Sequence, residues 1–191
     1  MNKDWVFFIV DFETTGLDAR EHYPIEVGGL FTDSNFTVLD IYKSLIKWPE
    51  LSVEVEANRG YWPSKYAEAY KIHRINPMIC TRMIKLDGIL VQSFKEVAAD
   101  LKLFCEKYKK GKRNPIMVSD NAQFEHSFMK KIFESSEVDF PFHYCTWDTS
   151  MFLELSGVRD PVAVHRAFPD AALVFSALMR ARGKLDLFEK M

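Results

Sequence analysis

The sequence is poor in cysteine and carries no excess of positive charge. Its 191 residues include three cysteines, Cys80, Cys105 and Cys145, and no two of them form a C-x-x-C pair. This scarcity argues against both a disulfide framework and a zinc knuckle. The formal net charge of -2 argues against a protein that wraps nucleic acid in positive charge, because such binding needs many Lys and Arg contacts to phosphates. A small local nucleic-acid site stays compatible with it.

Long apolar runs, repeats and low-complexity tracts are also missing. No stretch approaches the roughly 18 apolar residues of a membrane span. The early run "WVFFIV" is too short, and too close to charged residues, for a signal peptide. We therefore expect no membrane association and a cytoplasmic location. Because 48% of the residues are apolar and 14% aromatic, the chain can bury one full core, which predicts a single domain over residues 1–191.

The first half of the chain predicts an antiparallel start. Strands are expected over residues 6–12, 24–33 and 36–46, the last two joined by the turn-forming residues Asp33-Ser34-Asn35. Residues 50–90 contain prolines and short amphipathic segments, which favour brief helices. A longer helix is expected over 93–108, where apolar residues recur at helical spacing and Ser93 with Glu96 forms a capping box.

Strands and helices alternate in the second half. The expected strands cover 115–119 and 142–147, and the expected helices cover 121–133 and about 170–182, with Asp148 capping a further helix over 149–155. Such alternation implies parallel strands with helices packed on the sheet faces. The predicted fold is α/β, with a mixed five-stranded sheet and helices on both faces.

The first strand ends in two carboxylates. Asp11 and Glu13 are two residues apart, so they share one face of a strand while Phe12 points to the other. Like charges this close repel each other unless a cation such as Mg²⁺ or Mn²⁺ lies between them. Alternatively, one or both cap the turn-rich "TTGLD" segment that follows. The pair alone does not decide between these interpretations.

Other polar residues are expected at the same edge of the sheet. The helix that begins at Asn121 follows a strand predicted to be parallel to the first, which places Asn121 and Glu125 near the carboxyl ends of both strands. His165 lies in a predicted loop and Asp170 at the start of the last helix. Alone, His165 is better explained as a surface residue and Asp170 as a helix cap. Their combination with the paired carboxylates favours a functional site.

Three segments, in this order and at these separations, resemble the motifs of a known family. "DFETTGLD", "NAQFE" with "HSF" after it, and "HRAFPDA" are similar to the three motifs of the DEDDh 3'→5' exonucleases, which include oligoribonuclease, ribonuclease T and polymerase proofreading subunits and have a ribonuclease H-like fold. Weaker similarities at "PIEVGGLFTD", "SLIKWP", "YKIHRIN" and "WDTSMFLEL" extend the resemblance over nearly the whole chain. The first and third motifs are specific together, whereas "NAQFE" alone is weak.

The second motif departs from the family pattern. Where the family usually has Asp, the frame set by Asn121 places Glu125, which is one methylene longer. Asp120 could instead supply the missing acid, but we favour Glu125 because the helical frame points it over the strand edge. A catalytically weakened nucleic-acid-binding or regulatory module on the same fold is the alternative function. An accidental match would leave Asp11, Glu13 and Asp170 apart in space.

The resemblance implies a metal-dependent 3'→5' exonuclease that releases nucleoside 5'-monophosphates. Its cofactors would be two divalent ions, Mg²⁺ or Mn²⁺. Asp11, Glu13 and Asp170 would hold one ion, and Asp11 with Glu125 the second. His165 would act as the general base toward the attacking water, since histidine titrates near neutral pH.

The resemblance also implies how substrate binds. The expected partner is single-stranded DNA or RNA, or a short oligonucleotide. Backbone amides near Thr14 and Thr15 would bind the 3'-hydroxyl, and Leu17 would pack on the last base, a contact that tolerates any base. Asn121 and Arg166 complete the expected contacts, with Arg166 meeting phosphates. Since relatives are often dimers, a homodimer is compatible with the resemblance.

Overall fold

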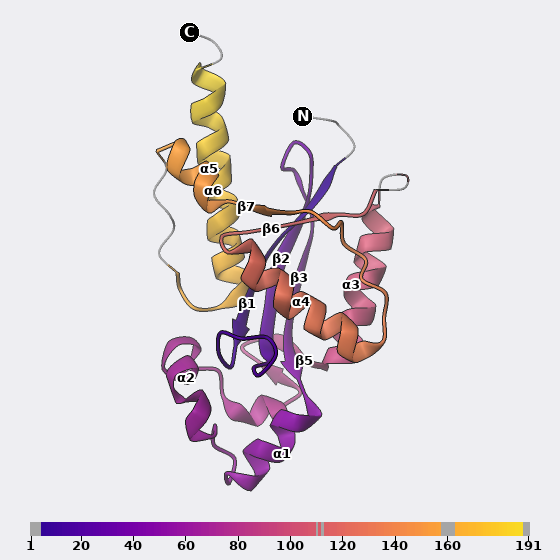
Figure 1. Cartoon of the computed structure of the whole chain (residues 1–191), viewed down its shortest axis with the longest axis vertical. Helices are drawn as coiled ribbons and strands as arrows, with labels where there is room; N and C mark the ends of the chain where they lie inside the picture. Colours follow the sequence, from indigo (N-terminus) through magenta and orange to yellow (C-terminus); the bar gives the residue numbers. More distant parts are fainter. Residues whose placement is uncertain (1–4, 110, 112, 158–162, 189–191) are drawn as a thin grey trace.

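The computed structural model describes residues 5–109, 111, 113–157 and 163–188 (Figure 1). Its centre is a mixed seven-stranded sheet in the order β4-β5-β3-β2-β1-β6-β7. The strands are β1 (Val6–Thr14), β2 (Pro24–Asp33), β3 (Val38–Lys47), β4 (Lys85–Leu86), β5 (Ile89–Ser93), β6 (Ile116–Ser119) and β7 (Thr146–Asp148). β2 is antiparallel to β1 and β3, whereas β6 is parallel to β1 and β7 is parallel to β6. The expected mixed α/β architecture is confirmed.

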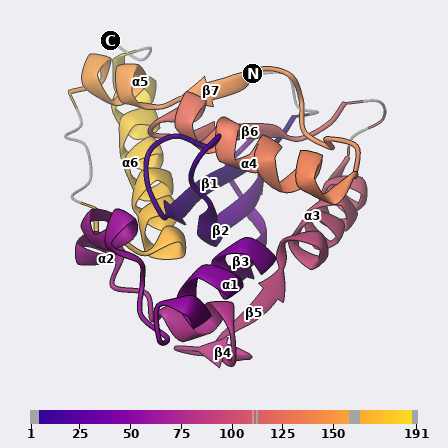
Figure 2. The same ribbon diagram turned by 60° about the horizontal axis from the view of Figure 1, so that its bottom comes forward.

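Helices cover both faces of the sheet, as expected. α3 and α4 lie side by side on one face and α6 on the other, while α1 and α2 lie beyond the end of the sheet (Figures 1 and 2). The helices are α1 (Pro49–Ala57), α2 (Ala67–His73), α3 (Phe94–Tyr108), α4 (Ala122–Ser136), α5 (Ser150–Leu155) and α6 (Ala167–Phe188), with short 3₁₀ turns at Ser64–Tyr66 and Pro77–Cys80. In the described ranges, no helix has both the length and the apolar character needed to cross a membrane.

The two faces of β1 contact different helices. On one face, its core residues with α3 and α4 are Val6, Phe8, Val10 and Phe12. Phe7 and Ile9 belong to a separate core formed with α5 and α6. Because side chains alternate along a strand, Asp11 and Glu13 continue the face of Phe7 and Ile9. β1 therefore directs both carboxylates toward the side covered by α6.

The sheet has two strands more than predicted. β4 and β5 form a hairpin in a region where the sequence favoured short helices. Asp87 and Gly88, with φ of 52° and 82°, make its two-residue turn, a geometry for which Asp-Gly is well suited. β5 then pairs in parallel with β3, and this pairing supports a strand too short to be stable alone. At the other edge, β7 begins at Thr146, later than the predicted 142.

The helix predictions hold with shifts at the ends. α3 has the expected capping box of Ser93 and Glu96. The residue that caps α5 is Thr149 rather than Asp148. The Asp148 carboxylate nevertheless accepts hydrogen bonds from the backbone of Ser150 at 3.0 Å and of Ala122 at 3.1 Å, so it ties together the starts of α5 and α4. α6 is longer than predicted at both ends.

Candidate active site

The residues predicted to form the catalytic centre lie together at the carboxyl end of β1. One hollow of about 290 Å³ is lined by Asp11, Glu13, Glu125, His165 and Asp170. β1 supplies the first two, the first turn of α4 supplies Glu125, and the first turn of α6 supplies Asp170. The separation in space expected of an accidental motif match is therefore not observed.

Gly28 allows α6 to reach this site. It pairs directly with Asp11 across β1 and β2. A Cβ added at Gly28 would lie 2.2 Å from the backbone nitrogen of Phe168 and 2.6 Å from the carbonyl carbon of Ala167. Such distances are well below van der Waals contact, so only glycine lets the first turn of α6 lie on β2. This close approach brings Asp170 beside the carboxylates of β1.

Asp170 holds the loop that precedes α6. Its carboxylate accepts hydrogen bonds from the backbone N–H groups of Val164 at 2.6 Å, His165 at 2.7 Å and Arg166 at 3.2 Å. Asp170 lies inside the first turn of α6 and binds N–H groups of the loop before the helix, so it is not the plain N-terminal cap considered from the sequence. A carboxylate offers about four lone-pair sites, so these three contacts leave room for a further ligand.

Three potential metal ligands lie close together in this hollow. Among the described residues, carboxylate oxygens of Glu13 and Asp170 and a ring nitrogen of His165 lie within 4.8 Å of one another. Glu13 and Asp170 are buried, whereas His165 is exposed. The closest group therefore differs from the predicted ligand set, because His165 takes the place expected for Asp11. Asp11 lines the same hollow as all three.

The surroundings of the site disfavour ionisation of its carboxyl groups. Burial, and then the charge of Glu13, raise the pKa of Asp11 well above its ordinary value. Burial, Glu26 and Asp170 raise the pKa of Glu13 to about 8. Carboxylates that resist ionisation in this way are stabilised as anions by a divalent cation. The residues present therefore fit a divalent metal ion.

Glu125 and Asp120 both line the hollow. Burial, followed by the charges of Asp11 and Glu13, raises the pKa of Glu125, and a hydrogen bond from the backbone of Phe12 opposes this rise. The Oε2 atom of Glu125 is buried and accepts no hydrogen bond from any residue that the structure describes, which is costly without a ligand. The hydroxyl of Thr149 donates to Asp120 at 3.5 Å. The unpartnered oxygen makes Glu125 the better candidate for the second-motif acid.

Two larger hollows adjoin the acidic one. The first, of about 590 Å³, is lined by Thr14, Thr15 and His165 on one side and by α2 on the other. The second, of about 580 Å³, is lined by Asn121 and by residues 17–20. Leu17, which is 85% exposed, and Phe124 line all three hollows. The residues expected near the 3' end of a substrate thus surround spaces that open onto the carboxylates.

Arg166 is the exception among the predicted site residues, since it does not line these hollows. Its guanidinium donates to Glu26 of β2 and to Asp87 of the β4–β5 turn. Neither partner was predicted from the sequence. An acid inside the otherwise apolar segment "PIEVGG" and the Asp-Gly turn signal were the available indications.

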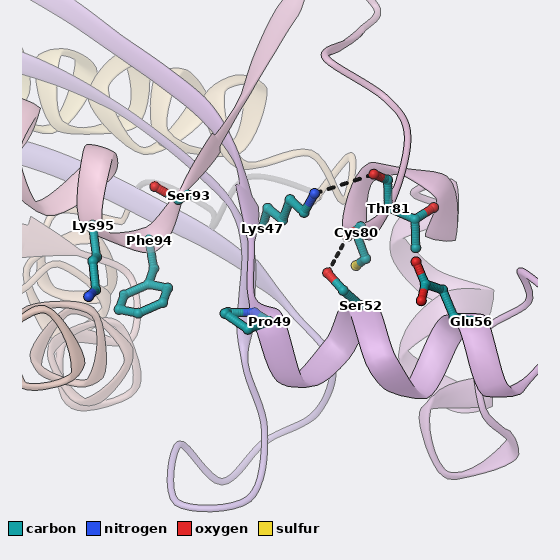
Figure 3. A pocket seen from close by; sticks show the side chains of 9 residues that line it. All are labelled: Lys47, Pro49, Ser52, Glu56, Cys80, Thr81, Ser93, Phe94 and Lys95. Carbon is teal, nitrogen blue, oxygen red and sulfur yellow. Dashed lines mark hydrogen bonds between the residues drawn. The ribbon is translucent and has the colours of Figure 1, made fainter.

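A separate hollow of about 530 Å³ lies at the carboxyl ends of β3 and β5. Figure 3 shows Lys47 reaching toward Thr81, whose carbonyl oxygen accepts from its Nζ at 3.3 Å. The Ser52 hydroxyl donates to the carbonyl of Cys80. Glu56 is the one acid among its described lining residues. This hollow therefore lacks the group of carboxylates that distinguishes the first one.

No family model and no curated protein matches the chain, whereas solved structures do. E. coli exonuclease I in complex with a dA16 oligonucleotide matches 90% of this chain and 39% of its own, with a TM-score of 0.64 and 17% identity. The zinc-bound form of the E. coli exonuclease I–ssDNA complex matches 98% and 43%, with a TM-score of 0.66 and 16% identity. Exonuclease I from Methylocaldum szegediense matches 93% and 41%, with a TM-score of 0.65 and 16% identity.

These similarities establish the fold. The chain has the ribonuclease H-like α/β fold of the exonuclease I structures, as the sequence resemblance implied. It spans about two fifths of the length of those chains. Because one fold supports many activities, the fold alone does not identify the activity of this chain.

Proposed function

We propose that this protein is a metal-dependent 3'→5' exonuclease. It hydrolyses phosphodiester bonds at the 3' end of single-stranded or short DNA or RNA and releases nucleoside 5'-monophosphates. The observation that carries this proposal is the convergence of Asp11, Glu13, Glu125, His165 and Asp170 in one acidic hollow. The fold shared with exonuclease I supports it.

The proposed site would take two divalent ions in the acidic hollow. Glu13 and Asp170 with Asp11 would hold one, and Asp11 with Glu125 the other. Mg²⁺ or Mn²⁺ bound there would polarise the scissile phosphate and offset the charge on the attacking and leaving oxygens. The raised pKa values of Asp11, Glu13 and Glu125 and the unpartnered oxygen of Glu125 support this occupancy. One of the similar structures is a zinc-bound form.

His165 acts as the general base. Its ring is exposed and lies beside Glu13 and Asp170, where it can take a proton from a water molecule aimed at the phosphate. The carboxylate of Asp170 fixes the backbone of His165.

The adjoining hollow receives the terminal nucleotide. Thr14 and Thr15 line it next to His165, so a 3'-terminal sugar held there has its phosphate near the carboxylates. Leu17 offers an exposed apolar side chain to the base. Such a contact does not discriminate among bases. The dA16 oligonucleotide in a similar exonuclease I structure supports a single strand as the substrate.

The test is degradation of 5'-labelled single-stranded DNA and RNA with Mg²⁺, with Mn²⁺ and with chelator. We expect a ladder that shortens from the 3' end, needs metal and is lost in the Glu125→Gln variant. Glu134→Gln, an exposed position on the same helix, is the matched control and should keep full activity. Retention of the strand by the wild type without any shortening would contradict the proposal and support a binding module instead.

A further inference from the structure

Arg166 connects three segments of the chain. Its Nε and Nη2 atoms donate to the Glu26 carboxylate at 2.9 and 3.0 Å, a bidentate geometry that is among the strongest a protein can form. Its Nη1 atom donates to Asp87 at 3.1 Å. The guanidinium therefore joins the loop before α6 to the middle of the sheet and to the β4–β5 turn. All three of its nitrogens are engaged within the protein.

Glu26 is a buried charge that needs this partner. Its side chain is 1% exposed, and it lies directly opposite Glu13 in the register of β1 and β2. Its Oε2 atom also accepts from the backbone N–H of Ala167 at 3.3 Å. A carboxylate buried beside another acid is tolerated only when a cation and further hydrogen bonds satisfy it. Arg166 and the first N–H of α6 satisfy both needs.

His165 directly precedes Arg166 and has a strained backbone. Its φ is +60°, a region that few residues other than glycine adopt. Strain of this kind persists only where the surroundings enforce it. On one side, Asp170 binds the N–H of His165. On the other side, the ion pair with Glu26 fixes Arg166, the residue that follows His165.

We propose that Arg166 is a positioning residue. Through its pairing with Glu26 it holds the 163–166 loop in the conformation that directs His165 toward Glu13 and Asp170. This inference rests on the proposed function, because it treats His165 as the general base. It assigns to Arg166 and Glu26 a role that requires no contact with substrate.

The kinetic constants distinguish positioning from the phosphate contact that the sequence suggested. A phosphate contact by Arg166 would make KM rise and depend on salt. Positioning lowers kcat instead, by about 10- to 100-fold as is typical when the support of an active-site ligand is removed, and leaves KM within about threefold. Glu26→Gln should reproduce the defect of Arg166→Gln, since both break the same pair.

The experiment is steady-state degradation of a single-stranded oligonucleotide by wild type, Arg166→Gln, Glu26→Gln and the double variant. We expect the double variant to lose no more kcat than either single variant, because residues that act as a unit are not additive. Lys107→Gln, which breaks the exposed Lys107–Asp40 ion pair, is the control. Millimolar guanidinium should restore kcat to Arg166→Ala but not to His165→Gln. If Arg166→Gln fails to fold, Arg166→Lys replaces it.

A second measurement does not depend on activity. The ring resonance of His165, one of five histidines in the chain, is assigned by its loss in His165→Gln. Arg166→Gln and Glu26→Gln should both shift or broaden this resonance and leave those of His22, His126 and His143 in place. His73, whose pKa is lowered by burial and then by the Arg166 charge, should also shift in Arg166→Gln and is not used as a reference. An unchanged His165 resonance, or a raised KM with unchanged kcat, would overturn the positioning role. An inactive wild type with the expected spectral change would refute the exonuclease function alone.

Discussion

Replacing Gly28 by alanine should move Asp170 of α6 away from Asp11 and Glu13 of β1. The added Cβ would lie 2.2 Å from the nitrogen of Phe168, and ordinary contact begins near 3.4 Å, so the first turn of α6 must move by about 1.2 Å. Overpacking of this kind costs about 1–3 kcal/mol of folding free energy. Asp170 moves with the turn, and a displacement of about 1 Å at a catalytic group lowers turnover by about 100-fold.

Three measurements test this reasoning about Gly28. Denaturant unfolding with chelator gives the loss of stability, titration calorimetry gives the affinity for Mn²⁺, and the oligonucleotide assay gives kcat. Gly183→Ala in α6 is the control, because among the described residues no side chain or other segment lies within 4 Å of the Cβ that it adds. Alanine should raise helix stability there by about 1 kcal/mol. Gly28→Ala with wild-type Mn²⁺ affinity and wild-type kcat would refute the claim that close packing of α6 on β2 builds the site.

Further predictions concern charge and the exposed site residues. Because the pKa of Glu13 is raised from 4.5 to about 8 in the folded protein, its stabilising contribution is complete below about pH 4.5 and lost as the pH rises through 8. Metal-free unfolding free energies should fall over that range, less steeply in Glu13→Gln, and a rise would contradict the assigned pKa. Leu17→Ala should leave the unfolding midpoint unchanged, since Leu17 is 85% exposed. It should raise KM about fivefold, because the lost contact with the base is worth about 1 kcal/mol. An unchanged KM would count against this contact. Among the described residues that line the three hollows, the Lys and Arg residues are Lys65 and Arg20, and each is paired with an acid. The plot of log Kd for single-stranded DNA against log salt concentration should therefore have a slope below about 2. Fluorescence anisotropy in Ca²⁺ measures this slope, and a steeper one would show that a basic surface binds the strand.

Local rules predicted the parts of the fold that local interactions decide. The period of two along a strand placed Asp11 and Glu13 on one face, and the capping box at Ser93 located the start of α3. The β4–β5 hairpin was missed, because its strands are short and are supported by pairing with β3 rather than by their own pattern. α6 begins earlier than predicted because Gly28, far away in the sequence, leaves space for its first turn.

The candidate site was predicted mainly from the order of the three family-like segments, and less from the hydrophobic periodicity or capping signals of any one segment. Asp11, Glu125 and Asp170 meet because β1 lies beside β6 and α6 packs on β1 and β2, and no local signal contains that arrangement. The partners of Arg166 were harder still to predict. Glu26 lies 140 positions away, and a lone acid in an apolar strand does not indicate which cation will pair with it.

The most direct test of the central claim compares the release of label from single-stranded DNA labelled at either end. We expect wild type with Mn²⁺ to release a 3'-terminal label at once as the nucleoside 5'-monophosphate and to shorten the 5'-labelled strand stepwise. Neither should occur with chelator or in Asp11→Asn. Early internal fragments, release from the 5' end, or full activity in Asp11→Asn would show that the acidic hollow at the end of β1 is not a 3'→5' exonuclease centre.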